Sequence, residues 1–289
     1  NEDDSCVYPL FGEDCETGAA ACGEGTEWDV TVQACVVPEF CQEDLDGDGV
    51  IGVNDLMQLL SVFGTDCPIW MCGDPVNYDG YDYATVQIGE QCWFAENLRN
   101  THYANGDDIP GNLNDSAWVA MTVGAQAVFG EGANDCINAE GTSDPDFYDF
   151  DVCNEFLSLE SFGRLYNSFA VTDSRGVCQV GWHVASNTDW TFLEEYLELS
   201  GFAGLESEVL KSVSGWPMGS SGTDDFGFGA LPGGQRTADG FSYAGGFGRI
   251  FSPSGYASAY RDFWGNGSMP TYVASSTDGL SVRCIKDTE

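Results

Sequence analysis

The segment from residue 44 to residue 55, DLDGDGVIGVND, constrains the local fold more than any other part of the sequence. It places carboxylates at its first, third, fifth and twelfth positions and a turn-forming glycine, Gly49, at its sixth. A hard dication such as Ca²⁺ takes several oxygen ligands, and this spacing directs them to one point. We therefore predict a calcium site formed by Asp44, Asp46, Asp48, the carbonyl of Val50 and Asp55.

The last position of this segment resembles a particular kind of calcium loop. Asp55 stands where an EF-hand loop carries a longer Glu, and a shorter carboxylate there is typical of dockerin-type loops. Dockerins carry two such loops, whereas this chain has one, so the resemblance implies a structural calcium site and not a cohesin-binding module. Leu56, Leu59, Leu60 and Phe63 follow at helical spacing and predict a short amphipathic helix that ends at Gly64.

The cysteines predict disulfides and an oxidising compartment. There are 12 cysteines, without paired CxxC motifs of the zinc-binding kind. Residues 1–40 form a disulfide-stapled segment in which four cysteines allow three connectivities, Cys22 with Cys35 across a short hairpin being one bridge we expect. Cys41 and Cys67 flank the calcium module at 41–67, and residues 68–289 form the main domain.

The charge of the chain excludes two classes of partner. With 47 acidic and 9 basic residues the formal net charge is -38, which repels nucleic acid and anionic lipid. Apolar runs are far shorter than a membrane span, so we expect no membrane insertion. Asn1 begins a polar stretch, as expected of a mature chain whose leader has been removed. We predict a secreted protein, extracellular or at the cell surface.

The main domain carries three clear structural signals. Residues 83–94 predict a hairpin around Gly89, and residues 104–160 are rich in loops and contain the pair Cys136 and Cys153. Residues 188–199 predict a helix with Ser186 as N-cap, Asp189 as the acid of a capping box, and Gly201 as its stop. Its buried face is expected to hold Trp190, Leu193, Leu197 and Tyr196, and residues 280–285 predict the last strand.

Six blocks of the main domain, in order, resemble one family. They are VQIGEQCWFAENLR (86–99), FGRLYNSFA (162–170), CQVGWHVASNTDW (178–190), LKSVSGW (210–216), DDFGFGALPGGQR (224–236) and LSVRCIKD (280–287). Together they resemble the Fibrobacter succinogenes major paralogous domain, over roughly residues 72–287. The resemblance implies an α+β, C-type-lectin-like fold with long loops, related also to formylglycine-generating enzymes. In such a fold we expect Cys178 to pair with Cys284 and Cys72 with Cys92.

Catalytic motifs are missing from the sequence. There is no HExxH, no G-x-S-x-G and no phosphate-cradling glycine loop. Of the two histidines, His183 is expected to be a core or helix-cap residue, and His102 lies in a loop without an assigned role. Formylglycine-generating enzymes need free copper-binding cysteines, whereas each cysteine here has a plausible disulfide partner. We therefore expect no enzymatic activity.

Two functions remain open. The first is a structural subunit of an extracellular assembly, such as a filament, sheath or surface layer, with copies of itself or other cell-surface proteins as partners. The alternative is a carbohydrate-binding adhesin or glycan-anchoring module with a polysaccharide as partner. Lectin EPN, QPD and WND motifs are absent, and Trp264-Gly265-Asn266 is interpreted as a turn. Eight aromatic residues near the C-terminus are candidates for a sugar platform, a protein interface or core: Tyr243, Phe247, Phe251, Tyr256, Tyr260, Phe263, Trp264 and Tyr272.

Overall fold

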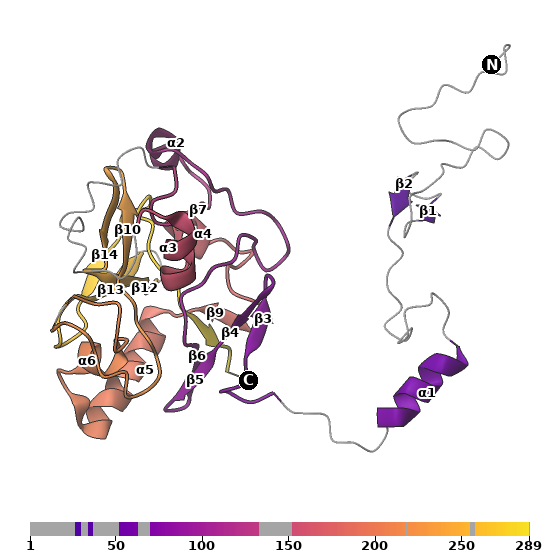
Figure 1. The fold of residues 1–289 in the computed structure, drawn as a ribbon, viewed down its shortest axis with the longest axis horizontal. Coiled ribbons are helices and arrows are strands. Elements are labelled where there is room, and N and C mark those ends of the chain that lie inside the picture. The colour runs from indigo at the N-terminus through magenta and orange to yellow at the C-terminus, as the bar shows by residue number, and fades with distance from the viewer. Residues whose placement is uncertain are drawn as a thin grey trace, which may run out of the picture. The chain divides into compact units, whose positions relative to one another are not determined.

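The computed structural model describes residues 27–29, 34–36, 52–62, 70–132, 152–217, 219–254 and 258–288. The chain divides into two compact units, Asn1–Ile69 and Trp70–Glu289 (Figure 1). In the first unit, β1 (Glu27–Asp29) pairs antiparallel with β2 (Ala34–Val36), and α1 (Val53–Val62) forms where helical spacing predicts it. The bridges expected for Cys22 with Cys35 and for Cys41 with Cys67 lie outside the described residues.

One sheet of the second unit joins the hairpin around Gly89 to the last strand. Its strand order is β5 (Thr85–Ile88), β6 (Gln91–Phe94), β15 (Cys284–Lys286) and β9 (Trp182–Val184), and each pair is antiparallel. Ile285 of β15 pairs with Trp93 of β6 and with His183 of β9. The predicted hairpin around Gly89 is confirmed. The predicted strand 280–285 is wrong in its bounds, because Leu280 and Ser281 form isolated bridges to Tyr166 and Ile250 instead.

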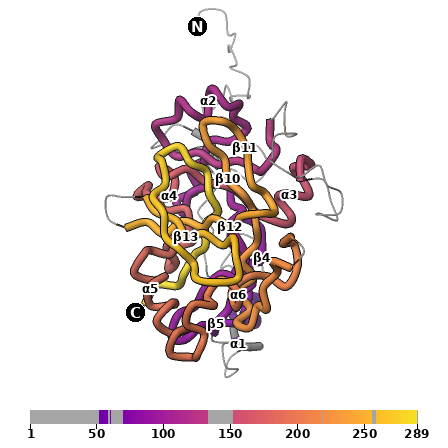
Figure 2. The backbone as a smooth tube through the Cα atoms, turned by 90° about the vertical axis from the view of Figure 1, so that its left-hand side faces the viewer, coloured from indigo at the N-terminus to yellow at the C-terminus, as the bar shows by residue number. Residues whose placement is uncertain are grey.

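The larger sheet is built from the C-terminal third of the chain (Figure 2). Its order is β11 (Gly240–Ala244), β10 (Gly233–Thr237), β12 (Gly248–Phe251), β13 (Ala259–Phe263) and β14 (Thr271–Val273). The β10–β12 pair is parallel and the others are antiparallel. Two short ladders complete the unit: β3 (Val76–Tyr78) with β4 (Tyr81–Tyr83), and β7 (Gln126–Ala127) with β8 (Leu165–Tyr166).

The helices of the second unit are short except for α5 (Asn187–Leu197). They are α2 (Asp115–Val119), α3 (Glu155–Phe162), α4 (Ser168–Val171) and α6 (Glu206–Leu210). The capping box of Ser186 and Asp189 at the start of α5 is confirmed. Gly201 breaks the helix as predicted: α5 continues into a short π-helical turn, η2 (Glu198–Phe202), in which Gly201 has non-helical dihedrals with a φ of 95°. Antiparallel sheets and separate helices make this unit an α+β domain.

The core of the second unit packs α5 between the sheets. Trp190, Leu193 and Leu197 are fully buried and contact side chains of both larger sheets, such as Trp93 and Ile250. The Trp190 ring lies 4.9 Å from Trp93 and 5.7 Å from Phe228, centroid to centroid. Burial of these aromatic faces provides the main hydrophobic stabilisation at this point.

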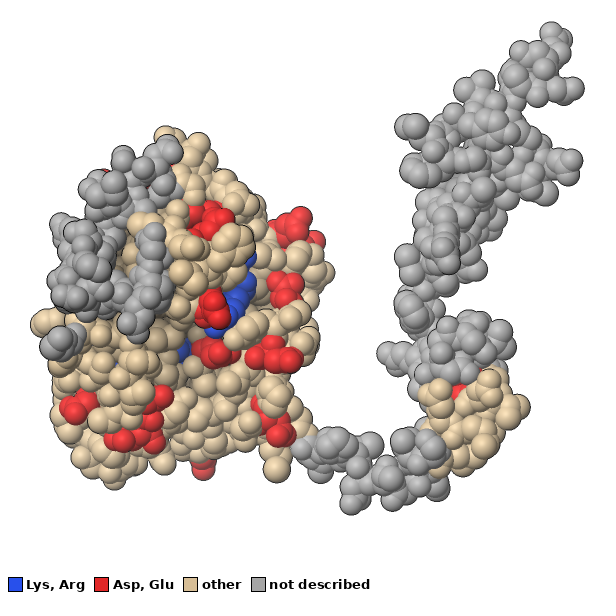
Figure 3. Space-filling model, in the orientation of Figure 1, with Lys and Arg blue, Asp and Glu red and all other residues tan. Residues whose placement is uncertain are grey.

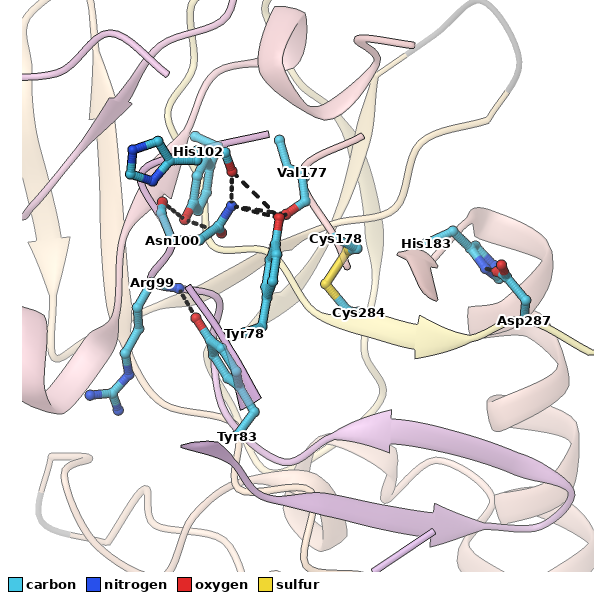
Figure 4. The surroundings of a disulfide bond; sticks show 11 residues. Tyr78, Tyr83, Arg99, Asn100, His102, Val177, Cys178, His183, Cys284 and Asp287 are labelled. Atoms are coloured by element: carbon cyan, nitrogen blue, oxygen red, sulfur yellow. Dashed lines mark hydrogen bonds and ion pairs between the residues drawn. A yellow bond between two sulfur atoms is a disulfide. The ribbon is translucent and has the colours of Figure 1, made fainter. Parts of the chain in front are cut away.

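Disulfides connect segments of the second unit that are distant in the sequence. Cys72–Cys92 and Cys178–Cys284 are both formed, as predicted, and Cys153 is also disulfide-bonded. Cys136 lies outside the described residues. The second bridge fixes the segment before β9 to the last strand (Figure 4). None of the helices in the described ranges combines the length and apolar character that crossing a bilayer requires.

Candidate binding groove

A groove of about 1040 Å³ opens on the second unit beside the four-stranded sheet. We call it the hairpin groove. It is lined by residues 70–72, by the β5–β6 turn at 87–92, by His183, by the outer side of α5, and by the chain end at 285–288. Strand β6 of the hairpin around Gly89 pairs with β15, and this pairing brings segments that are far apart in the sequence to one place.

In the groove, the hairpin turn at Gly89 packs closely against Tyr196 of α5. Gly89 has a φ of 61°, and a Cβ built there would lie 2.9 Å from Cδ2 of Tyr196. Only glycine therefore allows this turn to rest against the tyrosine ring. Nε2 of Gln91 donates a hydrogen bond of 2.9 Å to the backbone oxygen of Asp189, which fixes the hairpin to the first turn of α5.

Aromatic side chains form the walls. Phe192 is 55% exposed and Tyr196 is 39% exposed, and Leu199 continues the same side of the helix. On the opposite wall the ring of Trp70 packs edge-on against Trp182 at 5.7 Å, and its Nε1 donates to the oxygen of Pro75. The Cys72–Cys92 bridge holds this wall to β6. The groove thus keeps apolar rings accessible to solvent, a property expected of a binding surface.

His183 lies between two carboxylates in this groove, and Figure 4 shows it beside one of them, Asp287. Its Nδ1 is 2.6 Å from Oδ1 of Asp287 and its Nε2 is 3.1 Å from Oδ2 of Asp189. An ionised carboxylate only accepts hydrogen bonds, so this arrangement favours a proton on both ring nitrogens. The prediction of a core residue is wrong, because the side chain is 44% exposed; the association with the helix cap is confirmed through Asp189.

The electrostatics of this cluster favour its charged form. The hydrogen bond that His183 donates to Asp189 raises the pKa of His183 against the opposing effect of burial, and Asp287 raises it further. Burial acts against ionisation of Asp189, but hydrogen bonds from His183 and Ser186 outweigh it, so the pKa of this carboxyl lies below its usual value. The cluster therefore joins β9, α5 and the chain end through charge-assisted hydrogen bonds.

This arrangement suits binding better than covalent chemistry. Both nitrogens of His183 are occupied by carboxylates, and among the described residues no Ser, Thr or Cys side chain hydrogen-bonds to it. The two cysteines that line the groove are in a disulfide. What the groove offers a ligand is ring faces, the amides of Gln87 and Gln91, and the carboxylates of Glu90 and Glu195.

The residues predicted for calcium fall mostly outside the described ranges. Asp44, Asp46, Asp48 and Val50 are in this group. Asp55 is described: it is buried in the first turn of α1, where its Oδ2 accepts a 2.5 Å hydrogen bond from the backbone N–H of Gly52. Within the described residues no cluster of three or more His, Cys, Asp or Glu side chains is arranged to hold a metal.

The C-terminal aromatic residues do not line the groove. Phe251 and Phe263 are buried, and Tyr256 lies outside the described residues. Tyr243, Phe247 and Tyr260 surround the guanidinium of Arg249 at 5.0, 4.9 and 5.5 Å. The Tyr243 and Phe247 rings meet at 61°, so they form no flat platform. Trp264 and Tyr272 are exposed, and Trp264-Gly265-Asn266 lies in the segment between β13 and β14.

The sequence analysis placed Tyr196 on the buried face of α5, which is wrong because the side chain is exposed in the groove; the aromatic wall was not identified, although a signal was present. Phe192, Tyr196 and Leu199 follow one another at i, i+4 and i+7, which is a second apolar stripe beside the core stripe of α5. A helix with two such stripes either is buried on both sides or presents one stripe to a ligand. Here the second stripe faces the groove.

His183 gives the second unit a predictable pH dependence. Because the folded pKa is raised above the unfolded value of about 6.5, its stabilisation is full below that pH and is lost as the pH rises through the folded pKa. Asp189 acts in the opposite sense, losing its contribution only as the pH falls through its lowered folded pKa. We expect His183→Gln to reduce the decline in unfolding free energy above pH 6.5, measured by urea unfolding at several pH values. The matched variant His102→Gln should keep that decline; equal curves for both variants would contradict the assignment.

Comparison with known proteins gives one match. The family described as the Fibrobacter succinogenes major domain matches residues 86–286. This range includes both larger sheets and the strands, turn and helix around His183. Neither curated proteins nor solved structures give a significant match to the chain.

Proposed function

The chain belongs to the Fibrobacter succinogenes major domain family, and on that premise we propose that it is a secreted, non-catalytic surface protein that binds a carbohydrate chain in the hairpin groove. We further propose that the second unit has a C-type-lectin-like fold. The support is the pairing of β6 with β15, together with the bridge from Cys178 to Cys284. Disulfides support an extracellular location, because reducing compartments keep thiols free.

The observation that carries the proposal is the mixture of exposed rings and planar polar groups in one groove. Phe192 and Tyr196 present apolar faces, against which the CH groups of a sugar ring pack. The amides of Gln87 and Gln91 lie along the same hollow and match the hydroxyls of a sugar as hydrogen-bond partners. Glu90, Asp189, Glu195 and Asp287 make the lining acidic, which disfavours sulfated or uronate polysaccharides. A neutral glycan is therefore the ligand class that we propose.

We expect binding to neutral polysaccharides on a glycan array, followed by titration calorimetry with the best oligosaccharide. Phe192→Ala and Tyr196→Ala should each weaken binding by about two- to tenfold, which corresponds to the ~0.5–1.5 kcal/mol of one aromatic contact. Val213→Ala is the matched control, since it removes an exposed apolar side chain outside the groove. Absence of binding to every neutral glycan, or equal affinities for all four proteins, would contradict the proposal.

For the first unit we propose calcium held by Asp44, Asp46, Asp48, the carbonyl of Val50 and Asp55. The support is the ligand spacing and the position of Asp55 at the start of α1, where the twelfth loop residue is expected. Because calcium binds only the folded loop, saturating calcium at a hundred times its Kd should stabilise that unit by about 2.7 kcal/mol. We expect chelator, Asp46→Ala or Asp48→Ala to lower its melting temperature, and Asp239→Ala, an exposed residue of the second unit, to leave it unchanged. Identical calorimetric melting with calcium and with chelator would contradict the site.

One observation favours a structural subunit as the second candidate function. Strand β14 lies at the edge of the five-stranded sheet, and all three of its residues are exposed, Val273 at 79%. An uncharged edge strand rich in β-formers is a template for pairing with another chain. Self-association through this edge would fit an extracellular assembly. Light scattering of the calcium-loaded and chelated samples measures the oligomeric state. A monomer in both samples would contradict the function as a structural subunit.

A further inference from the structure

Lys211 is a buried nucleophile that has no part in the groove. It follows α6 as its C-cap residue, and its side chain is completely buried. Its ammonium lies 4.5 Å from the centroid of the Trp216 ring and donates a hydrogen bond to the backbone oxygen of Ser220. Among the described residues no carboxylate lies within ion-pair distance of Lys211. A buried lysine without a paired carboxylate is uncommon in proteins.

The amide of Asn266 lies directly beside this amine. Nζ of Lys211 is 2.6 Å from Oδ1 of Asn266, a residue 55 positions further along the chain. Two neighbouring carbonyl groups hold the pair together, since Ser220 accepts from the lysine and Ser221 accepts from Nδ2 of Asn266 at 3.4 Å. The carbonyl carbon of the amide is one covalent bond beyond the hydrogen-bonded oxygen. The hydrogen bond therefore holds the amine and the amide next to each other, which favours an intramolecular reaction between them.

The surroundings of Lys211 increase the fraction of reactive amine. Burial lowers its pKa to about 8, while the charge of Glu208 acts in the opposite direction. At neutral pH on the order of a tenth of the molecules then carry the neutral amine, which is the nucleophilic form. Glu208 precedes Lys211 by three residues across the end of α6, and it is the carboxylate whose charge acts on the amine.

We propose that Lys211 and Asn266 form an intramolecular isopeptide bond. The lone pair of the neutral Nζ attacks Cγ of Asn266, a new C–N bond forms, and the bond from Cγ to Nδ2 breaks. The proton lost by Nζ goes to the leaving nitrogen, and ammonia departs. The exchange of one amide for another needs neither an oxidant nor a reductant. The bond would lock α6 to the segment between β13 and β14.

Intact-mass spectrometry of the full chain, after reduction of its disulfides, tests the proposal. We expect a mass lower than that of the sequence by one ammonia, and a branched peptide joining Lys211 to Asn266 after proteolysis. Lys211→Met and Asn266→Ala should restore the full sequence mass. Asn77→Ala, at an asparagine in β3, should retain the loss of ammonia.

A fourth variant separates the reaction from a folding defect. Asn266→Asp keeps the shape of the side chain and should lose water in place of ammonia, giving the same final mass as the parent. A parent chain with the full sequence mass and a free Lys211 in peptide mapping overturns the proposal. Conversion of Asn266 to Asp in the parent without a branched peptide also overturns it, because hydrolysis would then have replaced attack by the lysine.

Discussion

Removal of the Cys178–Cys284 bridge is expected to lower the free energy of unfolding of the second unit by about 4–5 kcal/mol, the chain-entropy value for a loop of its length. The bridge closes 106 residues, which include α5, α6 and the whole five-stranded sheet. It therefore restricts the unfolded chain more than a short bridge does. In the folded state it holds β9 against β15, where only three residue pairs are in register.

The double variant Cys178→Ala/Cys284→Ala is suited to this test, because both cysteines are buried and alanine introduces no polar group. The segment before β9 keeps other contacts, since the oxygen of Val177 accepts hydrogen bonds from Tyr78 at 3.1 Å and from Asn100 at 3.0 Å (Figure 4). A loss of stability therefore reports the bridge and not the absence of all local order.

The matched control is Cys72→Ala/Cys92→Ala. That bridge spans 20 residues, so the same entropy relation gives a loss of about 3 kcal/mol. Urea unfolding of the three proteins measures both differences. A smaller loss for the long bridge than for the short one would show that the long loop is already ordered by other contacts in the unfolded chain.

Local signals in the sequence were sufficient for several elements. The hairpin turn at Gly89, the capping box of Ser186 and Asp189, and the apolar stripe of Trp190, Leu193 and Leu197 each depend on residues close together in the chain. For that reason their position was predictable. The break of the helix at Gly201 was predictable too, whereas the π-helical turn η2 around it is a feature that spacing rules do not anticipate.

Features that depend on distant contacts were beyond local reasoning. The parallel pairing of Gly234 with Gly248 joins the two halves of the five-stranded sheet, and Ser281 forms a bridge to Ile250 on its central strand; no periodicity in the sequence predicts either contact. The hairpin groove also arises from distant segments, and its acidic lining is hidden among many surface carboxylates. Figure 3 shows such carboxylates at many places on one face of the second unit, with few cationic side chains. Counting charges could not select the ones that meet at His183.

Arg283 is a further consequence of long-range packing, and its replacement should have the second large effect. Its side chain is completely buried beside β15. Nε donates to Oδ1 of Asn97 at 2.8 Å, and Nη1 donates to the backbone oxygens of Phe94 at 2.9 Å and Phe228 at 2.7 Å. Nη2 donates to the oxygen of Gly229 at 2.8 Å, and the guanidinium lies 4.5 Å from the Phe228 ring centroid. One side chain therefore satisfies four acceptors from two separate segments, 94–97 and 228–229.

We expect Arg283→Met to lower the free energy of unfolding by about 3–5 kcal/mol. Each buried acceptor left without a donor costs the folded state roughly 1–3 kcal/mol, and water that reaches the site offsets part of this cost. Arg283→Lys should also destabilise, since a single ammonium has three N–H groups at one point and does not reproduce the planar fork. The environment disfavours charge, for burial lowers the pKa of Arg283 to about 9. The native arginine is therefore held by its hydrogen bonds and not by an ion pair.

Arg175→Met is the matched control for this experiment. Arg175 pairs with Asp107 at 2.9 Å and with Asp173 at 2.8 Å, but its side chain is 36% exposed. Exposed ion pairs contribute about 0–1 kcal/mol, so the control should unfold almost like the parent in urea. If Arg283→Met lowered the free energy of unfolding no more than Arg175→Met does, water would have to reach the acceptors around Arg283 in the variant. The junction of β6, β15 and the Phe228 loop would then be stabilised by ring packing and disulfides alone.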